Sequence, residues 1–210
     1  MQIELLEVFG TDLTVVNAAR VSFGKESLSL SDKDIRLIKY LAKYKHISPF
    51  FHPQLRFRLK MPIWMAREWF RHEVGFARNE ISRRYVESDP EVWVPDHLFS
   101  RSESGNKQGH SEILVEDEGY WREFFDRELH HSADSYIALL RAGVAPEFAR
   151  GILPMNTMTE FIETGSLAAY ARLVQLRNTE SANDDIRTYA NNLAEYVKQA
   201  FPVSWEALMS

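Results

Sequence analysis

The sequence predicts an α+β fold in a single compact domain, and this prediction rests on two periodic patterns and the chain length. Residues 54–60 alternate strictly between polar and apolar side chains, which predicts a half-buried antiparallel strand. Apolar residues recur at helical spacing in 32–45, 118–142 and 182–200, which predicts three amphipathic helices. A chain of 210 residues is long enough for one sizeable core, and it shows no internal repeat.

Capping and turn residues place the remaining elements. Asp12 is expected to cap a helix that ends at Arg20, Ser31 to cap the helix at 32–45, and Ser166 to cap a helix that ends at Leu176. Pro62 and Pro146 each favour the first turn of a short helix. The other expected segments are strands at 2–8 and 156–164, a strand end at 93–95, a loop at 74–82, and a surface loop at 100–118 that exposes His110.

Composition excludes several classes of function. The chain has no cysteine, which excludes disulfides, thiolate catalysis and thiolate metal sites and suits a cytoplasmic location. It has no apolar run of about 18 residues and no basic-then-apolar leader, so neither a membrane span nor a secretory signal is expected. The net charge of −5 argues against binding to a nucleic acid polymer.

The stretch 67–85 carries the strongest functional signal. It contains five arginines, whose planar donor forks match phosphate and carboxylate oxygens. His72, Asn79, Glu80 and Ser82 lie among them and can hydrogen-bond a planar heterocycle. Together these residue types predict a pocket for a nucleotide. The alternative is a solvated helix end followed by a charged loop.

The order of these residues resembles a family signature. Arg71-His72-Glu73, eight residues and Ser82-x-Arg84 is similar to the Arg-His-Arg, seven or eight residues, Ser-x-Arg signature of the flavin-dependent thymidylate synthases. Further segments that resemble the same family follow one another in the family's order, at 18–22, 46–52, 149–154 and 176–177. The resemblance covers about residues 12–201.

The resemblance implies a fold and an activity. The fold is a compact α+β protomer with an antiparallel sheet flanked by helices, in a homotetramer whose active sites are shared between subunits. The activity is methylation of dUMP at C5 to give dTMP, with methylene-tetrahydrofolate as carbon donor, reduced FAD as hydride donor and NADPH as the reductant of the flavin. No metal is implied. The alternatives are a paralogue that methylates another pyrimidine nucleotide such as UMP, and a non-catalytic nucleotide-binding protein.

The resemblance also implies roles for individual residues. The catalytic candidates are Arg177, which would stabilise charge on the pyrimidine carbonyl, and His46, beside nucleotide and flavin. Arg150 is expected to reach the substrate phosphate from a neighbouring subunit. The substrate-binding candidates are Glu68, Arg71, Glu80, Ser82, Arg83, Arg84, Arg150 and Arg177. The cofactor-binding candidates are Ser22, Ser48, Arg71, His72, Glu73, Arg78, Asn79, Glu80, Ser166 and Arg172.

The chain departs from the family pattern mostly on the flavin side. Glu73 stands where the family has an arginine, and Glu68 where it commonly has Gln. The other departures are Ser166, Ala168, Arg172 and Ser181, where the family often has Asn, Arg, Asn and His. We hypothesise that Arg78 supplies, from the loop, the cation that is missing at Glu73. The alternative is that Arg78 is a solvated loop residue and that Glu73 caps or pairs locally.

Overall fold

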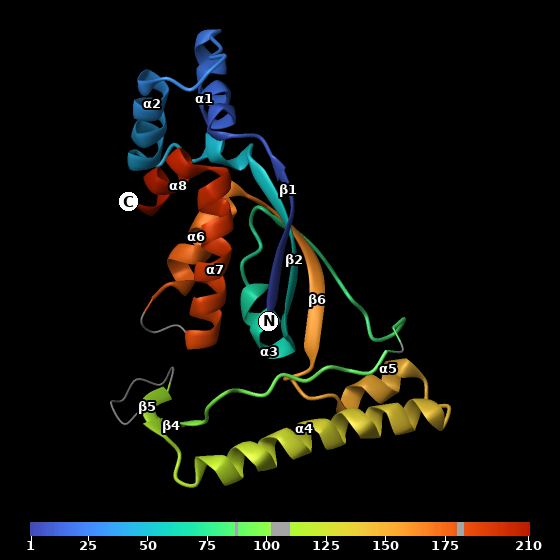
Figure 1. The fold of residues 1–210 in the computed structure, drawn as a ribbon. Coiled ribbons are helices and arrows are strands. Elements are labelled where there is room, and N and C mark those ends of the chain that lie inside the picture. Colours follow the sequence, from blue (N-terminus) through green and yellow to red (C-terminus); the bar gives the residue numbers. More distant parts are fainter. Residues whose placement is uncertain (87, 102–109, 180–182) are drawn as a thin grey trace. The chain divides into compact units, whose positions relative to one another are not determined.

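The computed structural model describes residues 1–86, 88–101, 110–179 and 183–210 and confirms the α+β class (Figure 1). The strands are β1 (Gln2–Phe9), β2 (Gln54–Pro62), β3 (Phe76–Glu80), β4 (Phe99–Arg101), β5 (His110–Leu114) and β6 (Met158–Ser166). The α-helices are α1 (Asp12–Arg20), α2 (Asp32–Lys43), α3 (Ile63–Trp69), α4 (Glu118–Arg141), α5 (Pro146–Ala149), α6 (Leu167–Arg177), α7 (Asp184–Ala200) and α8 (Pro202–Met209). Three short 3₁₀ turns are η1 (Val21–Phe23), η2 (Ser48–Phe51) and η3 (Arg150–Ile152).

Four strands form one sheet in the order β1-β2-β6-β3. Between β3 and β6, Ser166 N donates to Gly75 O and Ile81 N donates to Glu160 O, so one residue number rises as the other falls, as in an antiparallel pair. In β2 the predicted alternation is confirmed, because Leu55, Phe57 and Leu59 are at most 1% exposed while their neighbours face outward. The predicted antiparallel sheet is therefore confirmed.

The chain forms two compact units. Unit 1 comprises Met1, Lys60–Phe70 and Glu80–Phe161, and unit 2 comprises Gln2–Leu59, Arg71–Asn79 and Ile162–Ser210. Strands β2, β3 and β6 contribute residues to both, so the units are not successive segments of sequence. The single-domain organisation stays a prediction. Within the described ranges, no helix combines the length and the apolarity that a membrane span requires.

Helices form the core of unit 2. Helix α6 packs against α7 and α8, and α2 packs against α8 (Figure 1). In α6 every residue of 167–171 is buried, and its alanines allow neighbouring helices to approach closely. The N-terminus of α8 is capped from elsewhere in the chain, since the carboxylate of buried Asp12 accepts from Val203 N and Ser204 N at 3.1 and 2.8 Å.

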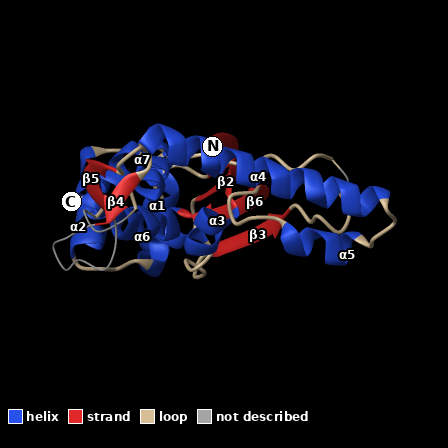
Figure 2. Cartoon of the chain, turned by 90° about the horizontal axis from the view of Figure 1, so that it is seen from below, coloured by secondary structure: helices blue, strands red, loops and turns tan. Residues whose placement is uncertain are grey.

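The long helix α4 organises unit 1. Its buried stripe consists of Leu129, Ala133 and Tyr136, at the spacing of one helix face. Helix α5 and the turn η3 pack beside α4 (Figure 2), where Ser132 Oγ donates to Ile152 O at 2.6 Å. The pair β4–β5 is a separate antiparallel sheet. This helix was predicted within one residue of its observed bounds.

Three predicted elements differ from the structure. Residues 76–80 are strand β3 and not a loop, because their backbone pairs with β6 despite a loop-like composition. The N-cap of α1 is Thr11 and not Asp12, because the Thr11 hydroxyl accepts from Leu13 N while Asp12 is already helical. At 93–95 the expected strand end is absent from the described chain, which has an isolated bridge from Val92 to Thr157 instead.

Two further differences concern the C-terminal half. The expected loop at 100–118 contains β4 and β5, although His110 is exposed as predicted and residues 102–109 lie outside the described residues. Helix α8 follows the helix that was expected to be the last, because Pro202 begins a new helix as well as ending the old one. Ser181 and the expected helix start at Ala182 lie outside the described residues.

Replacing Gly75 by alanine is expected to destabilise unit 2. Gly75 has φ +86°, and a Cβ there would lie 2.9 Å from both Ala169 Cβ and Ser166 Oγ. Gly24 also has a positive φ, +62°, but an added Cβ would meet nothing within 4 Å, so Gly24→Ala is a matched control for the backbone effect. Urea unfolding should show Gly75→Ala about 1–3 kcal/mol less stable than Gly24→Ala. Equal stability of the two variants would show that the packing tolerates the extra carbon.

Candidate active site

Arg177 and His72 form the centre of the predicted site in unit 2. Arg177 is the last residue of α6, and His72 follows α3 by three residues. The Nε of Arg177 donates to the Nε2 of His72 at 2.9 Å. An imidazole nitrogen that accepts a hydrogen bond is unprotonated, so neutral His72 carries its proton on Nδ1. The structure thus joins a predicted catalytic residue to a predicted cofactor-binding residue.

The surroundings keep His72 neutral. Burial lowers the pKa of His72 to about 4, and the positive charges of Arg177, Arg78, Arg172 and Arg71 contribute in that order. The residue is only 8% exposed. At neutral pH the imidazole is therefore an uncharged acceptor in a strongly positive neighbourhood, and such a neighbourhood favours an anionic ligand.

Arg78 lies in β3, and its guanidinium pairs with Glu163. Its Nε donates to Glu163 Oε2 at 2.5 Å, and the two side chains are 13% and 0% exposed. The same guanidinium lies over the Phe76 ring, 4.7 Å from its centre. Arg78 is therefore not a solvated loop residue, and a carboxylate already neutralises its charge. Its contact with FAD phosphates stays a prediction. Glu73, whose missing cation Arg78 was expected to replace, is exposed, and its backbone carbonyl accepts from Phe76 N.

A cavity of about 620 Å³ in unit 1 gathers four of the predicted substrate-binding residues, namely Glu80, Ser82, Arg83 and Arg150. The Glu80 carboxylate is held by Thr159, whose hydroxyl donates to it at 2.5 Å. Arg67, Thr157 and Thr159 also line the cavity. Among the described residues, the buried Thr157 hydroxyl has no hydrogen-bond partner. The cavity thus presents three arginines and several hydroxyls, a donor set that suits a phosphorylated sugar.

Arg84 is placed differently from its neighbour Arg83. It is exposed and lies over the Tyr85 ring, 5.5 Å from the ring centre. Ser82 Oγ accepts from Arg84 N at 3.3 Å. Arg83, which lines the cavity, donates from a terminal nitrogen to Ser88 O at 2.5 Å. Of these two adjacent arginines, Arg83 is thus the one that lines the cavity, and the role predicted for Arg84 remains untested.

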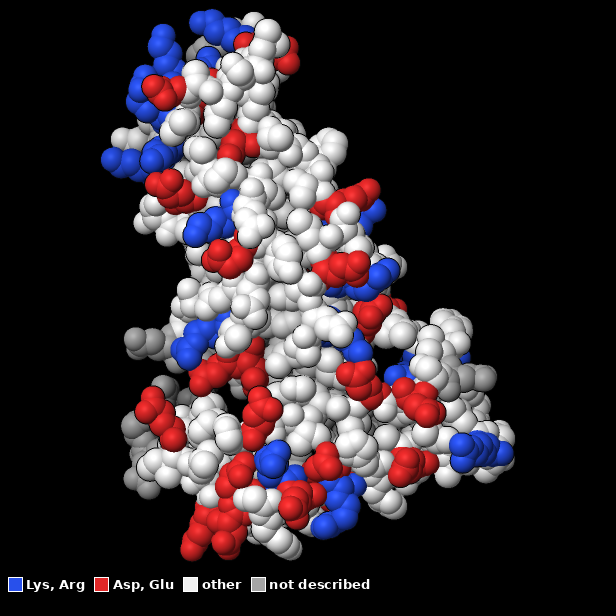
Figure 3. Space-filling view, in the orientation of Figure 1, with Lys and Arg blue, Asp and Glu red and all other residues white. Residues whose placement is uncertain are grey.

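A second cavity, of about 730 Å³, lies in unit 2 and brings together Ser22, His46 and Ser48. Arg20, Lys25 and Lys33 also line it. Figure 3 shows lysine and arginine side chains gathered over the end of this unit that carries α2, at the top of the view. Hydroxyls, an imidazole and three cations fit a ligand that combines phosphates with a heteroaromatic ring.

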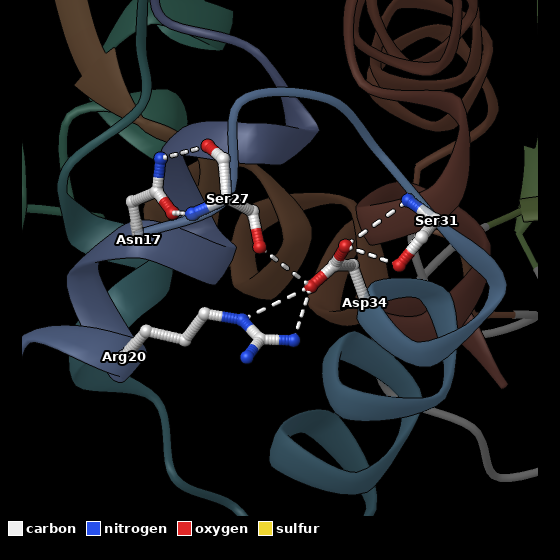
Figure 4. Close-up of polar contacts among 5 residues, drawn as sticks. All are labelled: Asn17, Arg20, Ser27, Ser31 and Asp34. Carbon is white, nitrogen blue, oxygen red and sulfur yellow. Dashed lines mark hydrogen bonds and ion pairs between the residues drawn. The ribbon is translucent and has the colours of Figure 1, made fainter. Parts of the chain in front are cut away.

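One side of this cavity is stabilised by the Asp34 carboxylate (Figure 4). Asp34 accepts from Arg20 Nε at 3.0 Å, from Ser27 Oγ at 3.1 Å, and from the backbone and hydroxyl of Ser31 at 3.0 and 2.6 Å. Asn17 adds a reciprocal pair of bonds to the Ser27 backbone. The network fixes Arg20 and the segment that leads into α2.

Asp34→Ala is expected to lower the free energy of unfolding by about 2 kcal/mol at neutral pH, because charge-assisted hydrogen bonds are lost. Hydrogen bonds, above all from Ser31 and also from Arg20 and Ser27, lower the pKa of Asp34 from 3.8 to about 2, although burial opposes them. Because this pKa is lower in the folded than in the unfolded protein, ionised Asp34 stabilises the fold at pH values above the unfolded-state pKa. The stability advantage of the wild type over Asp34→Ala should therefore shrink as the pH falls from about 4 to about 2. Urea unfolding across this range is the measurement, with Asp32→Ala in the same helical turn as control. A difference independent of pH would contradict the assignment.

The remaining candidates are less closely grouped. Ser166 is 3% exposed, and its hydroxyl accepts from Ala169 N as the N-cap of α6. Arg172 donates to Val74 O at 2.5 Å and so ties the segment after His72 to α6. Arg71 and Asn79 are exposed and Glu68 is half-buried. The sequence reasoning missed Thr159 and Glu163. A charged residue within the predicted strand at 156–164 was the available signal for Glu163.

Comparison with known proteins identifies the family of this chain. A family model described as "Thymidylate synthase complementing protein" matches residues 4–203. The chain belongs to the flavin-dependent thymidylate synthase family. Proteins named flavin-dependent thymidylate synthase are 37% identical over 210 residues in Thermosipho africanus and 36% over 205 residues in Thermus thermophilus. These matches cover 99% and 98% of this chain, and 90% and 74% of the relatives.

Solved structures agree with this family. A crystal structure of the UMP/dUMP methylase PolB from Streptomyces cacaoi bound with 5-Br dUMP has a TM-score of 0.87 and 28% identity, and covers 98% of this chain and 93% of its own. The same enzyme bound with 5-Br UMP gives a TM-score of 0.81. The resemblance of this chain to flavin-dependent thymidylate synthases is thus confirmed, and so is its predicted class, that of methyltransferase enzymes.

Proposed function

We propose that this chain methylates dUMP at C5 to give dTMP, with methylene-tetrahydrofolate as carbon donor, FAD as cofactor and NADPH as reductant. Within this family, the observation that supports the proposal most directly is the cavity of unit 1. Its Arg83 and Arg150 provide cations for the phosphate, while Ser82 and Glu80 provide a donor and an acceptor for the sugar and base. The proposed assembly is a homotetramer with active sites shared between subunits.

Arg177 is the proposed electrostatic catalyst. C5 of a uracil is a weak nucleophile, and its activation places negative charge on the ring carbonyl. A guanidinium fixed by a hydrogen bond to His72 would stabilise this charge as it develops. Ser82 is assigned a positioning role, since a serine hydroxyl acts as a nucleophile only with an adjacent base.

Two groups of residues in unit 2 fit FAD. The cavity at Ser22, His46 and Ser48 has the donors that phosphates require, with Arg20, Lys25 and Lys33 beside them. The arginines around His72 make a second positive region. Bound FAD would supply the hydride that completes the methyl group. The chain's own residues hold the cofactor and orient the nucleotide.

UMP is a second candidate substrate. The printed description of the solved relative PolB is a UMP/dUMP methylase, and its structures contain both 5-Br UMP and 5-Br dUMP. Discrimination between the two nucleotides depends on contacts to the ribose 2′-hydroxyl. Product analysis after incubation with each nucleotide separates the candidates.

The visible absorption spectrum of the purified protein tests the cofactor. A flavoprotein is yellow, because bound flavin absorbs in the near ultraviolet and in the blue. Incubation with dUMP, methylene-tetrahydrofolate and NADPH should then give dTMP. A colourless protein that binds no added FAD, or a flavoprotein that forms no methylated pyrimidine nucleotide, would contradict the proposal.

Mixing two inactive variants tests the shared site. Arg150 and Ser82 of one chain line the same cavity, so a shared site would take both from one subunit and Arg177 from its neighbour. This placement makes Arg150 and Arg177 the informative pair. Arg150→Ala and Arg177→Ala protomers, each inactive, should regain part of the activity after subunit exchange.

The control mixture is Arg150→Ala with Arg83→Ala, in which both defects affect the same cavity. This mixture should remain inactive, because the cavity is defective in both variants and no exchange of subunits restores it. If Arg150→Ala and Arg177→Ala exchange subunits but regain no activity, the site is not shared in this way.

A further inference from the structure

The His72–Arg177 hydrogen bond fixes the orientation of the guanidinium. It uses Nε, the nitrogen nearest the side-chain stem, and an Arg fork is planar. Holding Nε therefore sets the plane in which the two terminal nitrogens lie. The acceptor is largely shielded from solvent, because His72 is only 8% exposed. The imidazole thus determines where Arg177 presents its remaining donors.

The fold holds this acceptor from the same helix that carries the arginine. Arg172, one turn and a half before Arg177 in α6, donates to Val74 O, two residues after His72. Gly75 follows, and its backbone accepts from Ser166 N, the residue that caps α6. The segment 72–75 is therefore tied to both ends of α6. Such support suits a pair whose geometry must be fixed before substrate binds.

We propose that His72 is a positioning residue, which accepts a hydrogen bond from Arg177 and thereby aligns the guanidinium with the pyrimidine carbonyl. This inference rests on the proposed function, in which Arg177 contacts the pyrimidine. It is distinct from the cofactor contact predicted for His72, because it concerns Nε2, which accepts from Arg177.

The charges around His72 maintain the acceptor. Arg177 and Arg172 face it from α6, Arg78 from β3 and Arg71 from its own segment. Glu163, a buried carboxylate, pairs with Arg78. A protonated imidazole would have no lone pair for Arg177 and would repel it. Because burial and then these arginines lower the pKa of His72 to about 4, the hydrogen bond persists throughout the neutral range.

A double-mutant cycle tests the inference. The four proteins are wild type, His72→Leu, Arg177→Ala and the double variant, each saturated with FAD. His72→Leu should lower kcat/KM for dUMP by about 100-fold, the order of loss that follows misplacement of a reacting group. The double variant should be no worse than Arg177→Ala alone, because His72 acts through Arg177. Losses that multiply in the double variant would overturn the proposal.

Two further variants separate positioning from folding. His72→Gln keeps an acceptor near the position of Nε2 and should recover at least about tenfold over His72→Leu. His130→Leu is the same substitution at an exposed position on α4 and should behave as wild type in both kinetics and melting temperature. If His72→Gln is as impaired as His72→Leu while both fold normally, the acceptor is not what matters and the inference fails.

Nitrogen NMR of the imidazole tests the bond without substrate or cofactor. In ¹⁵N-histidine-labelled wild type at neutral pH, His72 should show protonated Nδ1 and unprotonated Nε2. Arg177→Ala should change the Nε2 signal and raise the pH at which His72 titrates, because a positive neighbour is lost. An Nε2–H tautomer, or a signal unaffected by Arg177→Ala, would refute the bond. A wild type that shows the bond but does not methylate dUMP would instead contradict the proposed function.

Discussion

Arg177→Ala is expected to lower kcat/KM for dUMP by about 100- to 1000-fold, which is the loss that follows removal of one fixed charge-stabilising donor. Arg177 ends α6, whose residues 167–171, Leu173 and Val174 are buried, so the position of the helix is set by the core of unit 2. The bond to His72 then orients its guanidinium. Steady-state kinetics at saturating FAD and folate measure the effect.

The matched control is Arg187→Ala, which removes an arginine of the same unit that pairs with Asp184 on one face of α7. This variant should retain wild-type kinetics. Arg177→Ala should also keep the thermal melting temperature of the wild type within a few degrees, because the side chain belongs to a helix end. Activity of Arg177→Ala within about threefold of wild type would remove Arg177 from the catalytic site.

Glu163→Ala is expected to lower the free energy of unfolding by about 3–5 kcal/mol, since breaking a buried ion pair leaves a buried charge behind. Glu163 is fully buried, and the Arg78 side chain that it neutralises is 13% exposed. Burial, and then Glu163, raise the pKa of the neighbouring Tyr170, so this phenol stays neutral and does not replace the lost charge at neutral pH. Urea-induced unfolding is the appropriate measurement.

Glu195→Ala, at an exposed position on α7, is the control and should change stability by less than about 0.5 kcal/mol. The ion pair of Arg78 and Glu163 also bears on FAD binding. If Arg78 contacts both Glu163 and the cofactor, Arg78→Ala should weaken FAD binding by more than its loss of stability explains. A Glu163→Ala variant as stable as Glu195→Ala would show that the pair contributes little.

The elements that sequence periodicity predicted are those in which local and tertiary preferences agree. Strand β2 alternates because one face is buried, and α2 begins at Ser31 in a capping box with Asp34. Strand β3 escaped prediction because its residues, Phe-Ala-Arg-Asn-Glu, have little β-propensity, and pairing with β6 determines their conformation. Helix α8 was missed because Pro202 was interpreted only as a stop.

The candidate site was predictable in composition but not in geometry. The family segments identified His72, Ser82, Arg150 and Arg177, and the structure adds which of them meet. Hydrogen bonds between residues far apart in sequence, such as Arg177 to His72, leave no local pattern. The same is true of Glu163, whose partner Arg78 lies 85 positions earlier in the chain. Two adjacent arginines, Arg83 and Arg84, could not be assigned to a cavity from their order alone.

Release of tritium from [5-³H]dUMP tests the proposed chemistry most directly, because methylation at C5 must displace that hydrogen. We predict release that requires methylene-tetrahydrofolate, NADPH and bound FAD, with an equal amount of dTMP formed. Arg177→Ala should release tritium about 100- to 1000-fold more slowly. A correctly folded flavoprotein that releases no tritium above the enzyme-free control would contradict the account.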